Sequence, residues 1–441
     1  MFLVVELKRF FYVIIIANIS GGFVDIVLSI AKKAKKSAFV ISRAETKVKN
    51  KILQDISKKL ISNSREIIEN NKRDIAKSEK EGISVSLLDR LRLNRDRIEK
   101  IAESINQVID FKDPVGEVIS GYNLPNGLIL TNIRVPLGVI GIIYEARPNV
   151  TVDASVLCLK SGNCVILRGS SHALSTNKKL VDIMRGVLAE NDFPEDAVQI
   201  IPTADREHVV RLMQLREYVD VLIPRGGKSL INSVVKNSKI PVIETGIGNC
   251  HIYIDNFLDG ISIDKIAEIL INAKTQRPSV CNAAEKLIVH KDIAEEILPT
   301  VLKELEGRGV VLKGCSITKK IFPSVGTASE EDWYQEYLDL KMAVKVVEDI
   351  EEAVEHINKY GSHHSDAIIT SSYENSILFT RAVDSSTVYV NASTRFTDGG
   401  QFGMGAEIGI STQKIHWRGP MGLKELTTNK FIVLGNGQVR E

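Results

Sequence analysis

The chain has 441 residues, of which 44% are hydrophobic and 25% charged, and its formal net charge is +2. These values are typical of a soluble globular protein of about two or three domains, and the small charge argues against nucleic-acid binding. Five cysteines without a CxxC pair and eight scattered histidines argue against disulfides and a structural metal, and they favour a reducing, cytoplasmic location.

The N-terminal residues 10–17 form an apolar run preceded by Lys8 and Arg9, which resembles a signal peptide. The run is shorter than the roughly 20 residues that a membrane span needs, and no Ala-x-Ala cleavage site follows it. We therefore expect neither export nor a membrane role. Residues 1–23 are interpreted as an extension of unknown role, either dispensable or the product of a start codon placed too early.

The next part of the chain is predicted to be helical and polar. Over residues 25–111, apolar side chains recur at three- and four-residue spacing, as in Ile52, Ile56 and Leu60. A change to alternating, strand-like residues around an Asn- and Gly-containing turn then predicts a long β-hairpin over 116–134. This hairpin is expected to leave the main body of the protein.

Strands and helices alternate after the hairpin. Strands are predicted at 138–144, 163–167, 197–201, 219–223 and 241–244, and helices at 148–160, 172–190, 206–218 and 228–237. Continuous apolar strands between amphipathic helices predict a parallel sheet that is covered on both faces. Right-handed crossovers place the carboxyl ends of these strands on one edge, where ligands bind.

A second series of the same kind begins near Ile263. Its strands are predicted at 285–290, 343–347, 366–370 and 387–390, and its helices at 293–305, 350–360 and 373–383. This pattern predicts a second α/β domain. A lone strand at 430–434 could pair with the outlying hairpin, either within the chain or across subunits.

Cys281 has the most reactive-looking setting of the five cysteines. Lys274 and Arg277 precede it with hydroxyl and amide side chains, and small residues follow it. A nucleophilic thiolate needs nearby positive charge or N–H groups and room for a substrate. A buried structural cysteine at a helix–strand junction explains this segment equally well.

Two predicted strands end in turns that suit anionic ligands. Arg168 and Ser170 follow one strand, where a phosphate or a ribose 2′-phosphate would fit, although a solvated turn is an equal explanation. Gly226 and Gly227 open a helix after another strand and suit a diphosphate. Leu222 stands where a P-loop requires its first glycine, so this is not a P-loop.

Arg147 and Asn149 follow the first strand of the series and should lie at the ligand edge. An Asn amide is a good donor to an oxyanion, and helix capping explains Asn149 equally well. The long glycine-rich loop at 394–405 also follows a strand; such loops are flexible connectors unless they are functional. No GxSxG motif is present in the sequence, so a serine hydrolase has little support.

Taken together, these segments resemble the aldehyde dehydrogenase superfamily, and within it the reductases of γ-glutamyl phosphate. The segments that carry the resemblance are 134–153, 160–163, 223–227, 250–255, 277–285, 394–400 and 402–413. The resemblance runs from about Val24 to the C-terminus, and the combination is highly specific although each piece alone is weak.

The resemblance implies an α/β, aldehyde-dehydrogenase-like fold with two Rossmann-like domains and an oligomerisation β-hairpin. The implied domains are a cofactor-binding domain at 24–255 with the hairpin at 114–134, a catalytic domain at 256–415, and a C-terminal return and oligomerisation strand at 416–441. The implied reaction is the NADPH-dependent reduction of L-glutamyl 5-phosphate to L-glutamate 5-semialdehyde and phosphate, in proline biosynthesis, through a cysteine thioester.

It also implies roles for particular residues. Cys281 would be the nucleophile, with Asn149 and the Cys281 N–H as the oxyanion hole. NADPH would be held by Arg168, Ser170, Gly226, Gly227, Ser229 and Glu336. The substrate carries a carboxylate and a phosphate, so arginines should converge on it. The candidates are Arg147, Arg277 and Arg395, with Asp153 for the α-amino group.

The resemblance also implies a homo-oligomer and a possible functional association with glutamate 5-kinase. It implies no binding of nucleic acid, membrane or metal. The nearest alternative is a hydrolytic, NAD-dependent aldehyde dehydrogenase, in which Glu244 would be the general base. A fused kinase–reductase does not fit into the length of the chain. A non-catalytic scaffold would have no need of Cys281, Asn149 and Arg168 together.

Overall fold

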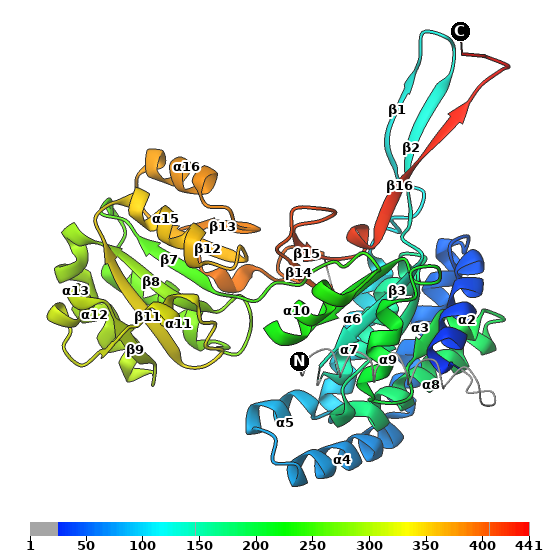
Figure 1. Cartoon of the computed structure of the whole chain (residues 1–441), viewed down its shortest axis with the longest axis horizontal. Coiled ribbons are helices and arrows are strands. Elements are labelled where there is room, and N and C mark those ends of the chain that lie inside the picture. Colours follow the sequence, from blue (N-terminus) through cyan, green and yellow to red (C-terminus); the bar gives the residue numbers. More distant parts are fainter. Residues whose placement is uncertain (1–24, 146, 405, 441) are drawn as a thin grey trace, which may run out of the picture.

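The computed structural model describes residues 25–145, 147–404 and 406–440, which form two α/β lobes and a projecting three-stranded sheet (Figure 1). The extension predicted at residues 1–23 lies outside the described residues. The predicted fold class, two parallel α/β units with an outlying hairpin, is confirmed. None of the described helices is long and apolar enough to cross a membrane.

Helices at the start of the described chain pack into the core of the first lobe. They are α2 (Ile26–Ile41), α3 (Thr46–Ser62), α4 (Ser64–Lys80) and α6 (Arg95–Asp110); α5 (Val85–Leu91) packs instead through Leu91 into a small separate cluster. In α6, Asn94 caps the helix by accepting a hydrogen bond from Arg97 N at 2.9 Å. Ile98, Ile101 and Ile105 are buried at helical spacing on the face that meets the core.

The first lobe contains a four-stranded parallel sheet in the order β5-β4-β3-β6. Its elements are β3 (Val139–Tyr144), α7 (Pro148–Lys160), β4 (Cys164–Arg168), α8 (Leu174–Glu190), β5 (Val198–Ile200), α9 (Arg206–Met213), β6 (Val221–Arg225) and α10 (Lys228–Asn237). The prediction of a strand at 241–244 is wrong. Val242 makes only an isolated bridge to Leu222, because the chain turns away and Thr245 bridges to Ser411 instead.

The second lobe contains a seven-stranded parallel sheet in the order β10-β9-β11-β8-β7-β12-β13. Its strands are β7 (Cys250–Ile254), β8 (Ala284–His290), β9 (Val311–Gly314), β10 (Gly326–Thr327), β11 (Lys341–Val347), β12 (Ser365–Ile369) and β13 (Thr387–Val390). Its helices are α11 (Ile263–Thr275), α12 (Lys291–Gly307), α13 (Ser316–Ile321), α14 (Glu330–Tyr334), α15 (Ile350–Tyr360) and α16 (Tyr373–Ala382). The short strands β9 and β10 were not predicted.

The boundary between the lobes lies at other residues than those predicted from the sequence. β7 pairs with β8 and β12, so the boundary lies before β7 and not after residue 255. After β13 the chain crosses back, and Ile408, Met421 and Leu426 are buried in the core of the first lobe. The return therefore begins before residue 416. Both differences arise because strand pairing over long sequence separations leaves no local signal.

A third, three-stranded sheet projects from the first lobe (Figure 1). The hairpin strands β1 (Val118–Asn123) and β2 (Ile129–Pro136) are antiparallel, and β16 (Thr427–Leu434) pairs with β2 along its whole length. The C-terminal strand therefore pairs with the hairpin of its own chain. Two short strands, β14 (Gly409–Ser411) and β15 (Gly419–Met421), form a separate hairpin.

Candidate active site

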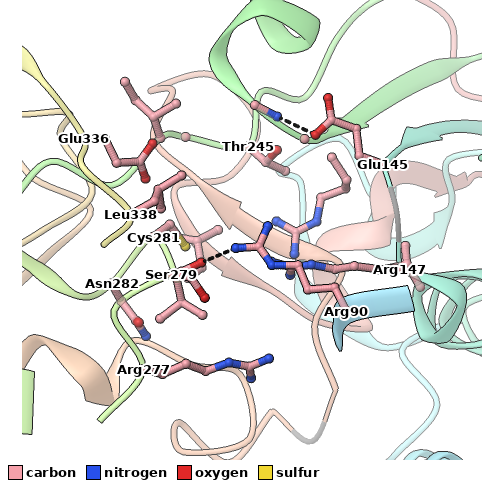
Figure 2. A pocket seen from close by; sticks show the side chains of 18 of the residues that line it. Arg90, Glu145, Arg147, Thr245, Arg277, Ser279, Cys281, Asn282, Glu336 and Leu338 are labelled. Carbon is pink, nitrogen blue, oxygen red and sulfur yellow. Dashed lines mark hydrogen bonds between the residues drawn. The ribbon is translucent and has the colours of Figure 1, made fainter. Parts of the chain in front are cut away.

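A cavity of about 330 Å³ lies between the two lobes and contains most of the predicted site (Figure 2). The predicted residues that line it are Cys281, Arg147, Arg277, Arg395, Glu336, Gly226 and Gly227. They come from the segments after β3, β6, α11, α14 and β13, so the fold assembles them from distant parts of the chain. This convergence at one cleft is typical of a ligand site.

Cys281 lies on the segment between α11 and β8, at the cavity wall. Among the described residues it is the cysteine that lines the cavity; Cys158, Cys164 and Cys250 are buried elsewhere. Its backbone is held from behind, because Cys250 Sγ donates to the Cys281 carbonyl at 3.2 Å. A Cβ atom on Gly248 would collide with the Cys281 carbonyl, so the backbones of Gly248 and Cys281 are in direct contact.

The Cys281 thiol is not acidic in this setting. Burial raises its pKa to about 11; Arg225 and Arg147 oppose that shift, while Glu407 and Glu336 add to it. The cationic approach seen in the sequence is therefore offset by burial and by two carboxylates. At neutral pH the thiol is mainly protonated. Formation of the thiolate therefore requires a bound ligand, or the neutralisation of a neighbouring carboxylate, that lowers the pKa of the thiol.

Alkylation of Cys281 by iodoacetamide should accordingly be slow at neutral pH. Because only the thiolate reacts, the rate constant should rise about tenfold per pH unit and level off near the raised pKa of about 11. The rate is measured by mass spectrometry of the Cys281 peptide between pH 7 and 10. A Cys281→Ala variant shows the background from the partly exposed Cys315. A rate that already levels off below pH 8 would contradict the raised pKa.

The cavity contains two arginines that the sequence analysis missed, Arg90 and Arg225. Arg90, on α5, donates from Nη2 to the Ser279 carbonyl at 2.9 Å (Figure 2). Arg225 ends β6, within the motif for which only the glycines were considered. Burial, followed by Arg225 and Arg90, lowers the pKa of Arg147 to about 10. The guanidinium groups are thus close enough to repel one another, which favours an anionic ligand between them.

Arg395 is held at the edge of the second lobe. Its Nε donates to Gln276 Oε1 at 2.9 Å, and Nη1 bonds to Asn282 Oδ1. Burial lowers its pKa, and Arg277 adds to that shift. Arg395 and Arg277 therefore approach the cavity from the same lobe as Cys281, whereas Arg90 and Arg147 approach from the other lobe.

Asn149 and Asp153 are not brought to the cavity with the others. Both lie on α7, one helical turn apart, and Asn149 Nδ2 donates to Asp153 Oδ2 at 3.0 Å. Burial raises the pKa of Asp153 to about 6. Glu244 does not line the cavity either. The four-residue spacing of Asn149 and Asp153 on the helix predicted at 148–160 was a local signal for their hydrogen bond that the sequence analysis did not use.

The predicted cofactor residues of the first lobe lie at the carboxyl ends of β4 and β6. Arg168 Nη2 donates to the Ala204 carbonyl at 2.7 Å, while Arg168 Nε and Ser170 Oγ are buried without a hydrogen-bond partner among the described residues. Buried polar atoms of this kind are normally satisfied by a ligand or water. Burial and then Arg206 lower the pKa of Arg168. These groups therefore fit a phosphate of a nucleotide.

The turn at the start of α10 fits the diphosphate of the same nucleotide. Gly227 N donates to Glu145 Oε2 at 3.1 Å, and nothing lies within 4 Å of a Cβ on Gly227, so an anion can approach the helix N-terminus. Ser229 is exposed in the first turn of α10. The Glu145 carboxylate accepts a hydrogen bond from the N–H of this turn, which shows that the turn can bind an anionic group.

Glu336 is fixed at the same cavity as Cys281. Its Oε1 accepts a hydrogen bond from Gly248 N at 2.6 Å, and burial raises its pKa. Fully buried side chains hold the backbone on both sides of it: Lys286 Nζ donates to the Gln335 carbonyl at 2.8 Å, and Glu285 Oε1 accepts from Leu338 N at 3.2 Å. The position of Glu336 at the cavity is therefore determined by the interior of the second lobe.

The model of the aldehyde dehydrogenase family matches residues 14–312, well over half of the chain. The chain therefore belongs to the aldehyde dehydrogenase family. An acetylating aldehyde dehydrogenase from Geobacillus thermoglucosidasius has the same fold, with a TM-score of 0.69, at 17% identity, over 94% of this chain and 97% of that one. At that identity the similarity concerns the fold alone.

Within this family, proteins named gamma-glutamyl phosphate reductase match this chain over most of its length. The one from Clostridium perfringens is 56% identical over 409 residues, which are 93% of this chain and 98% of that protein. The crystal structure of the one from Thermotoga maritima is 51% identical, has a TM-score of 0.92, and is matched over 95% of this chain and 100% of its own. The resemblance inferred from the sequence is confirmed.

Proposed function

We propose that this protein reduces L-glutamyl 5-phosphate to L-glutamate 5-semialdehyde and phosphate in proline biosynthesis, with NADPH as the reductant. The similar proteins named gamma-glutamyl phosphate reductase, matched over almost their whole length, support this proposal. The observation that carries it is the cavity, in which one cysteine is surrounded by five arginines. This combination suits an acyl phosphate that also bears a carboxylate.

Cys281 is the proposed nucleophile. Its thiolate attacks the acyl carbon, the bond from that carbon to the phosphate oxygen breaks, and a thioester forms as phosphate leaves. Phosphate departs as an anion, so its departure needs cations more than an acid. Arg225 and Arg147, which oppose the raised pKa of Cys281, favour the thiolate that starts the reaction. A nicotinamide cofactor, when bound, supplies the hydride that reduces the thioester.

Asn149 and the Cys281 N–H are the proposed donors to the tetrahedral oxyanion. The amide of Asn149 donates to Asp153 in the structure, so this role requires the Asn149 side chain to turn toward the cavity. The proposed contact of Asp153 with the α-amino group of the substrate requires the same rearrangement. Arg147, Arg277 and Arg395, all at the cavity, are proposed to bind the two anionic groups of the substrate.

NADPH is proposed to bind along the carboxyl ends of β4 and β6. The buried, unpartnered atoms of Arg168 and Ser170 support a contact with the ribose 2′-phosphate. Gly226, Gly227 and Ser229 are proposed to hold the diphosphate at the start of α10, and Glu336 the nicotinamide ribose. A 2′-phosphate carries negative charge that NADH lacks, so Arg168 should favour NADPH.

Replacing Arg168 by glutamine should weaken this preference. We expect kcat/KM for NADPH to fall about 10- to 100-fold, the size of a lost charge-assisted hydrogen bond, with little change for NADH. Steady-state kinetics with both nucleotides measure the change. The exposed Arg216 provides the matched control, Arg216→Gln. An equal loss with both nucleotides would show that Arg168 does not contact the 2′-phosphate.

A hydrolytic aldehyde dehydrogenase would require a general base beside the thioester. Glu244 does not line the cavity, which supports a thioester that is reduced instead of hydrolysed. Glu336 and Glu407 do line the cavity, and the assay below also tests whether either of them supports hydrolysis.

The projecting sheet is proposed to pair with a second copy of the chain. Val118, Ile119 and Tyr122 on β1 and Phe431 and Val433 on β16 are exposed on it, and exposed apolar residues of this kind mark interaction surfaces. The same proposal states that the protein forms a homo-oligomer, that it associates functionally with glutamate 5-kinase, and that it is located in the cytoplasm.

The reverse reaction tests the proposed function. Wild-type protein is mixed with glutamate semialdehyde and NADP, and NADPH formation is followed at increasing concentrations of inorganic phosphate. The proposal predicts steady-state NADPH formation that saturates with phosphate. Rapid steady-state turnover without phosphate would instead identify a hydrolytic dehydrogenase, and no turnover on this aldehyde would contradict the proposed substrate.

A further inference from the structure

Arg90 connects the first lobe to the loop that carries the nucleophile. It lies on α5, far from Cys281 in the sequence, and it lines the same cavity. Its Nη2 donates to the carbonyl of Ser279 at 2.9 Å, two residues before Cys281 (Figure 2). This contact spans the cleft, because Ser279 belongs to the second lobe. Arg90 is therefore in position to affect both the loop and a ligand beside it.

The end of α5 that carries Arg90 is anchored to the first lobe. Asn71 on α4 donates to the Leu91 carbonyl at 2.8 Å and accepts from Leu93 N at 2.7 Å. Leu91 and Ala173 form a small buried apolar cluster, against which Leu87 packs. These contacts fix the backbone from which Arg90 extends, and the hydrogen bond to the Ser279 carbonyl holds its guanidinium group in the cleft, so that less conformational entropy is lost on binding.

The charges around Arg90 favour an anion with more than one negative charge. Burial lowers the pKa of Arg90, Arg277 adds to that shift, and Glu145 opposes it. Arg90 and Arg277 also contribute to the lowered pKa of Arg147. A guanidinium group has five N–H donors, and the Ser279 carbonyl accepts from one nitrogen only. The other donors are available to a phosphate, which guanidinium groups bind through parallel hydrogen bonds.

We propose that Arg90 binds the phosphoryl group of the acyl phosphate while it holds the Ser279 carbonyl, so that phosphate and nucleophile are aligned by one side chain. This inference rests on the proposed function. The phosphoryl group is joined through one bridging oxygen to the carbon that Cys281 attacks, so it must lie beside the 279–281 segment. Arg395, which bonds to Gln276 and Asn282, approaches from the opposite side and is left for the carboxylate.

The proposal is tested with Arg90→Gln and Arg90→Lys in the reverse reaction. We expect KM for inorganic phosphate to rise about 10- to 100-fold in Arg90→Gln, the effect of losing a charge-assisted hydrogen bond, and less in Arg90→Lys, which keeps the charge. KM for the semialdehyde should change little. Arg92→Gln removes an exposed arginine just beyond the same helix and should behave as wild type.

A second readout does not depend on turnover. Inorganic phosphate should slow the alkylation of Cys281 by iodoacetamide in the wild type, and this protection should be lost in Arg90→Gln. Retention of NADPH binding, measured by fluorescence, shows that the variant is folded. A variant that does not bind NADPH is replaced by Arg90→Lys, in which the proposal still predicts weaker protection.

The outcomes separate this inference from the function on which it rests. Wild-type turnover that ignores phosphate would overturn the proposed function itself. Phosphate-dependent wild-type turnover with an unchanged phosphate KM in Arg90→Gln would overturn the role of Arg90 alone. A rise in KM for the semialdehyde in place of phosphate would assign Arg90 to the carboxylate, and would likewise overturn the inference.

Discussion

Replacing Cys281 by alanine is expected to lower kcat by roughly 10⁴-fold or more, in either direction of the reaction. The loss is large because the nucleophile starts the covalent route, and the remaining groups of the site retain only binding and charge stabilisation. Among the described residues, Cys281 is the cysteine at the cavity, and the neighbouring Cys250 is fully buried behind the Cys281 backbone, so it cannot take its place.

This variant should still bind NADPH, because the proposed nucleotide groups lie at the ends of β4 and β6 and at Glu336, and not on the 276–283 segment. Steady-state rates and nucleotide affinity are measured side by side. Cys315→Ala is the matched control, since Cys315 is also partly buried but lies at the start of α13, away from the cavity. A Cys281→Ala protein that retains a tenth of the activity would exclude Cys281 as the nucleophile.

The second large effect is expected in the interior of the second lobe. Lys274 Nζ and Glu285 Oε2 are 3.2 Å apart, and both side chains, together with that of Lys286, are fully buried. Burial raises the pKa of Glu285 and lowers the pKa values of both lysines. Glu285→Gln removes the carboxylate that compensates two buried ammonium groups. We expect the free energy of unfolding to fall by about 3 kcal/mol.

Urea unfolding measures this change, and Glu268→Gln is the control. Glu268 pairs with Lys265 at 2.7 Å on the surface, so its loss should cost no more than about 0.5 kcal/mol. Glu285 also holds Leu338 N, next to Glu336, so NADPH affinity should weaken in Glu285→Gln and not in the control. Equal midpoints for both variants would mean that the buried cluster does not require the carboxylate.

Local patterns predicted most of the elements and the presence of the Cys281 segment at the cavity. Apolar periodicity located the helices and the buried strands, and the setting of Cys281 drew attention to the segment before β8. The motif at the end of β6 was also recognised, although only its glycines were given a role. Arg225 was missed there because the sequence does not show which side chain at the end of a strand points toward the cavity between the lobes.

Features that depend on distant contacts could not be predicted. Arg90 lies on a short helix that resembles an ordinary amphipathic segment, and only the folded chain brings it to the Ser279 carbonyl. The burial that raises the pKa of Cys281 is likewise a property of packing. The lobe boundary was misplaced for the same reason, since β7 is assigned by its partners β8 and β12.

The most direct test of the central claim, that Cys281 carries the acyl group, is a rapid-mixing experiment without phosphate. Protein, NADP and glutamate semialdehyde are mixed, and NADPH is followed by absorbance. If Cys281 forms a thioester that only phosphate releases efficiently, about one NADPH per subunit should form in a burst, followed by slow turnover. Added phosphate should restore rapid turnover, and Cys281→Ala should show no burst. Rapid turnover without phosphate, or a burst that persists in Cys281→Ala, would contradict the account.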